Sequence, residues 1–195
     1  WIRLEHLPHI WQRYQEVDLT SLQACGDTAR NITGCPVAGI DRDEAIDAHP
    51  LVQKVTQYVL DHPEHGSTLP RKFKIAITGC RDDCILARIN DLAFTPAHRD
   101  GEVGFNVWAG GGLSDYPRLA SDLDLFVTSA QVVATVRAVI DVYKEFGDYE
   151  NKAVNRFRRL VEEMGPATIR QEMEQRASFP FQPSGESLSQ EPRYD

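Results

Sequence analysis

The sequence predicts an α+β (α/β) domain in which helices flank one mixed sheet. Segments of strand and helix length follow one another in the order strand, helix, strand, strand pair and three helices. The chain has 195 residues and 42% hydrophobic content, which is enough for one sizeable core or for one and a half small ones. An order of this kind, with a single core, is typical of one sheet covered by helices.

The first third of the chain contains two predicted helices and a loop. Residues 1–16 predict an amphipathic helix. Pro8 interrupts the pattern and marks the start of the helix proper, because proline suits the first turn. Residues 19–24 are a short candidate strand, and the Gly-, Asn- and Pro-rich residues 26–39 are a loop or a tight helix entry. Residues 50–62 carry apolar side chains at helical spacing and predict the second helix.

Three strands are predicted in the middle of the chain. Residues 73–78 are a continuous apolar run and predict a buried strand. Residues 91–96 are a short apolar strand or turn, and residues 104–109 alternate as a half-buried strand. Residues 98–101 between them have the composition of a hairpin turn, so the two segments are expected to pair.

The last part of the chain is predicted to be mostly helical. A short helix is expected at residues 117–123, and residues 129–147 give the clearest helical pattern, with Ser129 as the N-cap. Two more helices follow at residues 154–165 and 166–176. The Ser-, Pro- and Gln-rich residues 177–195 predict a flexible linker or tail.

The overall charge excludes some partners. The net charge is −8 and the pI is near 5.2, which argues against nucleic acid, because a phosphate backbone requires a basic surface. No apolar run approaches the roughly 20 residues of a membrane span. The chain begins at Trp1 without a signal-peptide pattern, so we expect it to come from inside a longer polypeptide. Its four cysteines favour a reduced, cytoplasmic protein.

A basic segment is the first candidate binding site. Lys72 and Lys74 lie two residues apart where the predicted strand begins, so in extended chain their ammonium groups project from one face and Phe73 from the other. Two neighbouring cations repel each other unless an anion lies over them or both point into water. With Arg71 beside them on an acidic protein, we expect these lysines to bind a small anion.

The cysteines are the second candidate site. Cys80 and Cys84 lie four residues apart and could share one metal ion or cluster, with Cys25 and Cys35 as further candidates. The alternative is that some are small buried apolar residues. Carboxylates between Cys80 and Cys84 oppose an iron–sulfur cluster. The tetrapeptide Ile-Thr-Gly-Cys at residues 32–35 recurs at residues 77–80, by common origin or by chance.

Two other groups carry weaker signals. The glycines at residues 110–112 lack both the dinucleotide-binding and the P-loop pattern, so they predict close backbone packing or a turn near a large ligand. The six histidines have no metal-ligand spacing with a cysteine and are expected at the surface.

Four motifs, in order, resemble the nitrite and sulfite reductase family of siroheme proteins. The first is A-C-G-D followed by R-N-I-T-G-C-P-V-A-G at residues 24–39, and the second is L-P-R-K-F-K at residues 69–74. The third is I-N-D-L-A-F at residues 89–94, and the fourth runs from G-F-N-V to G-G-G-L-S at residues 104–114.

The resemblance implies a domain organisation. Members of this family consist of two pseudo-repeated halves, each with a ferredoxin-like half-domain and a siroheme domain. Residues 1–16 would be the end of the first half-domain, and residues 17–176 the first siroheme and 4Fe-4S-type domain. The 4Fe-4S ligands are expected in the C-terminal half, so Cys80 and Cys84 are weak candidates and this chain alone is expected to be inactive.

The resemblance also implies residue roles. Arg30, Lys72 and Lys74 would bind the substrate anion at the siroheme iron and act in catalysis, and they would also contact the cofactor. Asn31 and Arg71 would help to hold the siroheme carboxylates. These roles agree with the chemistry, since a polycarboxylate and an oxyanion both require charged hydrogen-bond donors.

The implied activity is assimilatory, six-electron reduction of nitrite to ammonia, with ferredoxin or a similar protein as electron donor. The alternatives are a sulfite reductase proper, a relative of the precorrin-processing oxygenases, and a non-catalytic tetrapyrrole-binding module. Lys74 is typical of sulfite reductases, whereas the stretches at residues 78–84 and 90–94 resemble those of microbial nitrite reductases and favour nitrite.

Overall fold

The computed structural model describes residues 1–114 and 116–190 and contains one mixed sheet with the strand order β1-β2-β3-β4-β5. The first three strands run parallel, and β3, β4 and β5 run antiparallel. These strands are β1 (Thr33–Gly34), β2 (Ile75–Ile77), β3 (Leu92–Arg99), β4 (Glu102–Ala109) and β5 (Ser121–Val127). The mixed sheet predicted from the sequence is confirmed.

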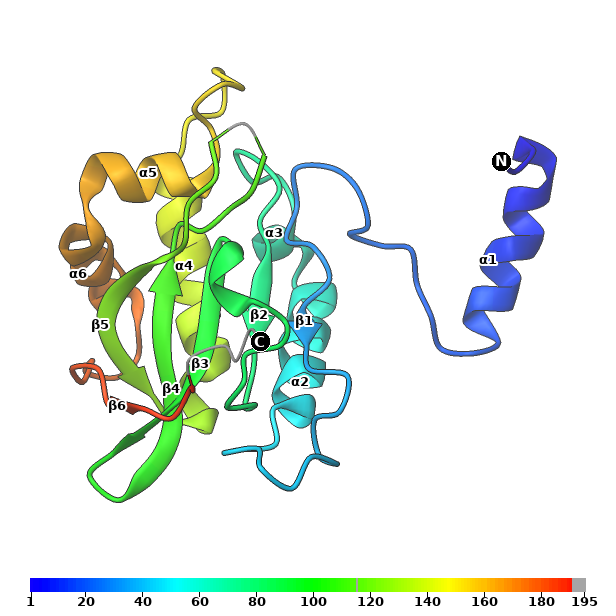
Figure 1. Ribbon diagram of the computed structural model, residues 1–195. Coiled ribbons are helices and arrows are strands. Elements are labelled where there is room, and N and C mark those ends of the chain that lie inside the picture. The colour runs from blue at the N-terminus through cyan, green and yellow to red at the C-terminus, as the bar shows by residue number, and fades with distance from the viewer. Residues whose placement is uncertain (115, 191–195) are drawn as a thin grey trace.

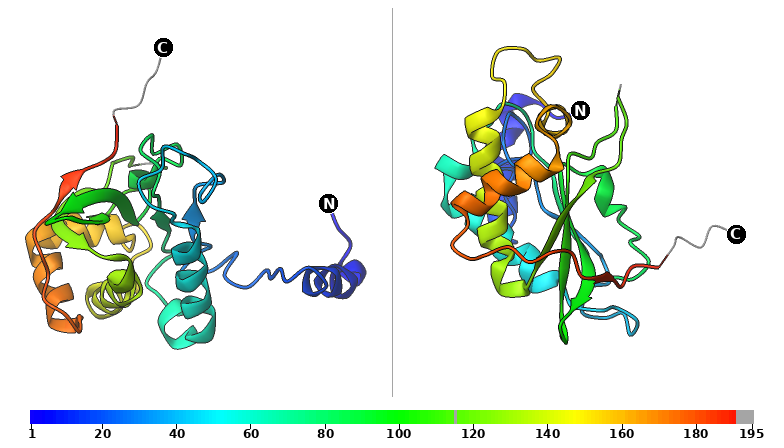
Figure 2. Two further views of the ribbon diagram at one scale, coloured as in Figure 1. Left: turned by 90° about the horizontal axis from the view of Figure 1, so that it is seen from below. Right: turned by 90° about the vertical axis from the view of Figure 1, so that its left-hand side faces the viewer.

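Helices cover one face of this sheet (Figures 1 and 2). The α-helices are α1 (Leu7–Gln15), α2 (His49–Asp61), α3 (Pro63–Gly66), α4 (Val132–Phe146), α5 (Phe157–Met164) and α6 (Pro166–Arg176). Three short 3-10 helices are η1 (Leu4–His6), η2 (Ala87–Ile89) and η3 (Ser129–Gln131). Among the described residues, no helix combines the length and apolar character needed to cross a membrane.

The core lies between the sheet and the helices. On β3, Phe94 points into this core, where its ring meets Phe105 of β4 edge to face at 6.4 Å. Ala93 points to the opposite face and packs with Ala76 and Ala87 in a second, small apolar cluster. The strand period of two therefore gives the sheet one thickly covered face and one thinly covered face.

The hairpin between β3 and β4 forms where the sequence predicts it. Asp100 and Gly101 occupy its two central positions with φ of 49° and 85°. Two consecutive residues with positive φ match the twist of antiparallel strands, and Asp-Gly is a favoured pair for such a turn.

The N-terminal helix is confirmed but stands away from the rest of the molecule (Figure 1). Helix α1 has no buried residue. The short strand predicted at residues 19–24 is wrong. Gln23 has a φ of 62°, which a strand does not accommodate, and its side chain donates a hydrogen bond to the Val59 carbonyl.

Two boundaries in the second half differ from the sequence prediction. The helix expected at residues 117–123 is wrong, because residues 122–125 alternate polar and apolar and belong to β5, with Leu123 buried. The N-cap of the following helical segment is Thr128 rather than Ser129. Thr128 and Gln131 bond to each other's backbone in a capping box.

The C-terminal segment packs on the sheet, unlike the flexible tail expected for residues 177–195. Phe181 is only 7% exposed and belongs to the main core. The backbone of Phe126 donates to the Gln182 carbonyl, and β6 (Glu186–Ser187) pairs with β3. Apolar packing, backbone pairing and side-chain bonds, such as the two between Asn106 and the Gly185 backbone, hold a segment whose composition suggests no order. Residues 191–195 lie outside the described range.

Replacing Phe181 tests this packing. Phe181→Ala should lower the free energy of unfolding by about 3 kcal/mol, because it leaves a cavity in the core. Urea unfolding of the chain measures the change. The matched control is Ser178→Ala at an exposed position of the same segment, which should change stability by less than about 0.5 kcal/mol. Equal stability of both variants would mean that the segment does not pack.

Candidate anion-binding site

The basic segment at residues 71–74 is anchored by a buried phenylalanine. Phe73 is fully buried, and its ring lies 5.2 Å from Phe157 and 5.6 Å from Tyr143. Lys72 is partly exposed and Lys74 is exposed. The alternation predicted from the sequence is confirmed, with the aromatic ring in the core and both ammonium groups outside it.

Backbone hydrogen bonds bring the loop of residues 26–39 beside this segment. Phe73 accepts a bond from the Arg30 amide at 2.8 Å and donates one to the Thr28 carbonyl at 2.9 Å. Two segments more than forty residues apart in sequence therefore meet as a short parallel bridge. This bridge brings Arg30 close to Lys72. The spacing of the two residues in the sequence does not predict that they are neighbours.

Arg30 is held by the loop that precedes it. Its guanidinium donates to the carbonyls of Ala24 at 2.5 Å and Gly26 at 3.0 Å. The Nε atom is buried and has no hydrogen-bond partner among the described residues. Asn31, next to it, is exposed. The guanidinium is thus fixed in place and keeps N–H donors, that of Nε among them, without a partner among the described residues.

Arg71 forms a partly exposed ion pair. Its guanidinium lies 3.1 Å from the Asp27 carboxylate, and both side chains are about two-fifths exposed. Such a pair contributes little stability, because water screens it. Its main effect is to place Arg71 at the edge of the basic segment.

A buried ion pair lies beneath the segment. Asp91 is completely buried, and both of its oxygens lie 3.1 Å from the guanidinium of Arg156. It also accepts a hydrogen bond from the Lys74 amide at 2.9 Å. Burial raises the pKa of Asp91, and the Arg156 charge opposes that rise. Neither residue had a role assigned from sequence, since 65 positions separate them.

Together these side chains form what we call the cationic cluster, which consists of Arg30, Arg71, Lys72, Lys74 and Arg156. Lys72 lies among the other four, and the Arg156 charge, partial burial and the remaining three charges lower its pKa. Among the described residues, Asp27 and Asp91 are the carboxylates that form ion pairs with it. A local excess of positive charge on a chain with net charge −8 is a site suited to an anion.

The glycine-rich strand end is a site of close packing. A Cβ added at Gly111 would lie 2.2 Å from the Arg88 carbonyl oxygen, and one at Gly110 would lie 2.9 Å from Val161. No larger residue fits at either position without displacement of its neighbours. The first of the two roles predicted for these glycines, close backbone packing, is confirmed.

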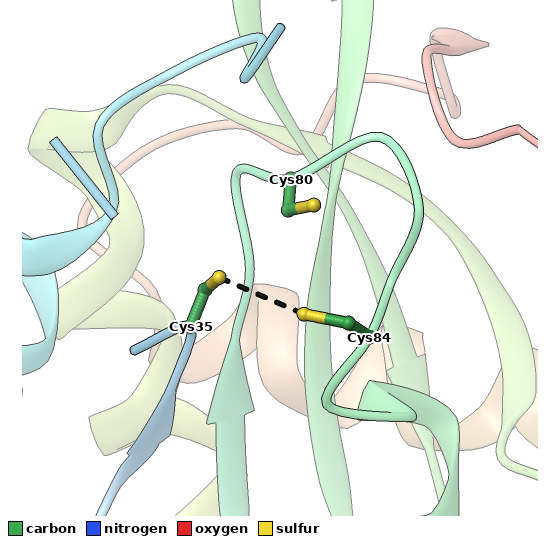
Figure 3. A group of neighbouring side chains, drawn as sticks. All are labelled: Cys35, Cys80 and Cys84. Atoms are coloured by element: carbon green, nitrogen blue, oxygen red, sulfur yellow. Dashed lines mark hydrogen bonds between the residues drawn. The ribbon is translucent and has the colours of Figure 1, made fainter. Parts of the chain in front are cut away.

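Three of the four cysteines meet near the ends of β1 and β2 (Figure 3). The Sγ atoms of Cys35, Cys80 and Cys84 all lie within 4.8 Å of one another. Cys25 is exposed and not part of the group. Partial burial and the two neighbouring thiols raise the pKa of Cys84 to about 11. The sequence predicted the Cys80 and Cys84 pair and offered both Cys25 and Cys35 as further candidates, and the structure brings Cys35 alone of these two to the pair.

Comparison with known proteins identifies the class. The family model described as "Nitrite and sulphite reductase 4Fe-4S domain" matches residues 25–181, so the chain belongs to this family. It is 45% identical over 185 residues to the ferredoxin–nitrite reductase of Leptolyngbya laminosa, covering 93% of the chain and 36% of that protein. It is 36% identical over 176 residues to a ferredoxin sulfite reductase of Mycolicibacterium paratuberculosis, covering 90% of the chain and 31% of that protein.

A solved structure supports the same assignment. The fold matches that of the Mycobacterium tuberculosis NirA protein with a TM-score of 0.88 and 32% identity, covering 96% of this chain and 34% of that one. The chain therefore spans about a third of the length of these relatives. The family and the α/β architecture expected from the motifs are confirmed.

The buried ion pair allows a stability test. Asp91→Asn should lower the free energy of unfolding by about 3–5 kcal/mol, because Arg156 would keep a buried charge without its partner. Asp27→Asn, which breaks the exposed pair with Arg71, should cost less than about 1 kcal/mol. Urea unfolding of both variants measures the difference. Equal losses of unfolding free energy in the two variants would show that the buried ion pair contributes no more to stability than the exposed one.

Proposed function

We propose that this chain forms the anion-binding wall of a siroheme-dependent nitrite reductase that converts nitrite to ammonia with six electrons. The observation that carries the proposal is the cationic cluster, in which Lys72 is surrounded by four other positive charges. Family membership and the names of the relatives support the same chemistry. The domain limits that follow from the family are residues 1–16 for the end of a ferredoxin-like half-domain and residues 17–176 for a siroheme domain.

The residues of the cationic cluster fit siroheme, which carries many carboxylates. The buried Nε atoms of Arg30 and Arg156 lack hydrogen-bond partners among the described residues, and Lys72 and Lys74 form no ion pair there. Arg71, Asn31 and the cluster's other cations would hold the carboxylates through charged hydrogen bonds. Bound siroheme would supply the iron that receives the substrate and transfers electrons to it.

The side chains of this chain would bind and protonate the substrate. Arg30 is fixed by two carbonyls and can orient an oxyanion through its remaining N–H groups. Lys72 has a lowered pKa, so it gives up a proton more readily than an ordinary lysine. Because the oxygens of nitrite leave as water, proton donors beside the anion are needed, and Lys72 and Lys74 would serve in this role.

Parts of the reaction depend on chain outside these residues. We expect the ligands of a 4Fe-4S cluster, the group that would supply the electrons, in a C-terminal half of the same enzyme. Ferredoxin is the proposed electron donor, in line with the name of the Leptolyngbya relative. The four cysteines are free, which favours the cytoplasm as the compartment.

Sulfite is the second candidate substrate. Lys74 and the similarity to a ferredoxin sulfite reductase favour it, while the higher identity to a nitrite reductase favours nitrite. Nitrite and sulfite are both small oxyanions, and the cationic cluster suits either. Comparing kcat/KM for the two anions on the complete enzyme distinguishes these activities.

The role of Lys72 can be tested in the complete enzyme. Lys72→Met should lower turnover of nitrite by about 100-fold or more, the range expected for loss of a proton donor. Siroheme content, measured from the cofactor's absorbance, should fall much less. The control is Lys54→Met, which removes an exposed lysine of α2 and should leave turnover unchanged. Full turnover in Lys72→Met would exclude Lys72 from the site.

The lowered pKa of Lys72 gives a pH dependence. Lys72 must be protonated to attract an anion, and it loses its proton at a lower pH than an ordinary lysine, whose pKa is about 10.4. We therefore expect KM for nitrite to rise with increasing pH, beginning at a lower pH than the titration of an ordinary lysine would give. Lys72→Arg keeps its charge over the range in which a lysine titrates and should remove most of that rise. An identical pH profile in the variant would assign the effect to another group.

A further inference from the structure

The three clustered thiols lie away from the cationic cluster, at the other end of β2. Lys74 precedes β2 and Cys80 follows it, a separation of roughly 20 Å at the rise of an extended strand. Because β1 and β2 are parallel, their carboxyl ends share one edge, and Cys35 and Cys80 both leave from that edge. Cys84 completes the group from the loop after β2, and its Sγ points toward Cys35 (Figure 3).

The loop that carries two of the thiols is held in position. Gly79 packs so closely on the turn at residues 41–47 that an added Cβ would lie 1.6 Å from the Ile46 carbonyl oxygen. Its own carbonyl accepts a bond from the Ala45 amide at 2.8 Å. The Cys80 amide donates to the Thr78 hydroxyl, and Arg81 donates to the Asp43 carbonyl. Close packing of Gly79 and several hydrogen bonds thus hold the loop that brings the thiols together.

The spacing of the sulfur atoms suits one metal ion. Zinc binds thiolates at about 2.3 Å, so two thiolates on one tetrahedral ion lie roughly 3.8 Å apart. The Sγ atoms of Cys35 and Cys84 are 3.7 Å apart, and the third Sγ is within 4.8 Å of both. In a 4Fe-4S cluster each thiolate binds a different iron, so the sulfurs must be farther apart.

We propose that Cys35, Cys80 and Cys84 bind a single thiophilic divalent ion, with zinc as the expected metal. Three thiolates leave the fourth tetrahedral position open, and the exposed residue Cys84 gives solvent access to it. The carboxylates of Asp82 and Asp83 lie in the same loop. The negative charge of these carboxylates opposes ionisation of the neighbouring thiols, but it attracts a divalent cation. This site is independent of siroheme and of the proposed reductase activity.

Cobalt binding tests the proposal without the siroheme. The 195-residue chain, stripped of metal under reducing conditions, is titrated with Co²⁺. We expect one equivalent to bind, with thiolate-to-cobalt charge-transfer absorption and the strong visible bands of a tetrahedral ion. Zinc should displace the cobalt and remove both signals. Absence of these signals would overturn the proposal.

Thiol reactivity gives a second measurement that needs no variant. With zinc bound, a thiol reagent should rapidly modify only Cys25 of the four cysteines, and a chelator should expose the other three. Rapid reaction of all four in the presence of zinc would contradict the site. Iron with acid-labile sulfide on these thiols, or a disulfide between Cys35 and Cys84 in reductant, would likewise overturn a single-ion site.

Variants assign the ligands. Cys35→Ser, Cys80→Ser and Cys84→Ser should each weaken cobalt binding by more than about 100-fold, beyond the usual effect of losing a residue that only hydrogen-bonds to a metal ligand. The matched control is Cys25→Ser, which should bind one equivalent with unchanged spectra. Circular dichroism of the metal-free variants confirms that they are folded. Unchanged cobalt binding in any folded variant of the three would exclude that residue as a ligand.

Discussion

The burial of Phe73 determines where the basic side chains lie. Its ring packs against Tyr143 and Phe157 in the core, so the lysines on either side must project from the opposite face of the chain. Its backbone bonds to the loop of Arg30, which brings a third cation to the same place. One buried aromatic residue therefore connects the main core of the domain to the position of the cationic cluster.

The ion pair of Asp91 and Arg156 links stability to the proposed activity. Its burial joins the start of β3 to the residue just before α5. Arg156 is also the largest influence that lowers the pKa of Lys72. A cluster of like charges is destabilising by itself, and an anion bound among them would relieve this repulsion. The same guanidinium thus stabilises the fold and makes Lys72 a readier proton donor.

The two ends of β2 carry different chemistry. Cations gather where the strand begins, and thiols gather after it ends. The first copy of the recurring Ile-Thr-Gly-Cys sequence runs through β1, whereas the second begins at Ile77, the last residue of β2, and continues into the loop after it. A sheet of this kind brings the carboxyl ends of its parallel strands to one edge, which explains why Cys35 and Cys80 meet.

The sequence by itself determined the mixed sheet, most helices and the two-faced segment around Phe73, because hydrophobic periodicity is a local property. It also identified the family from four ordered motifs. Only the tertiary structure decided that residues 177–190 pack on the sheet, that Arg156 pairs with Asp91, and that Cys35 joins Cys80 and Cys84. Each of these contacts joins residues distant in the chain, and local periodicity carries no information about which distant segments meet.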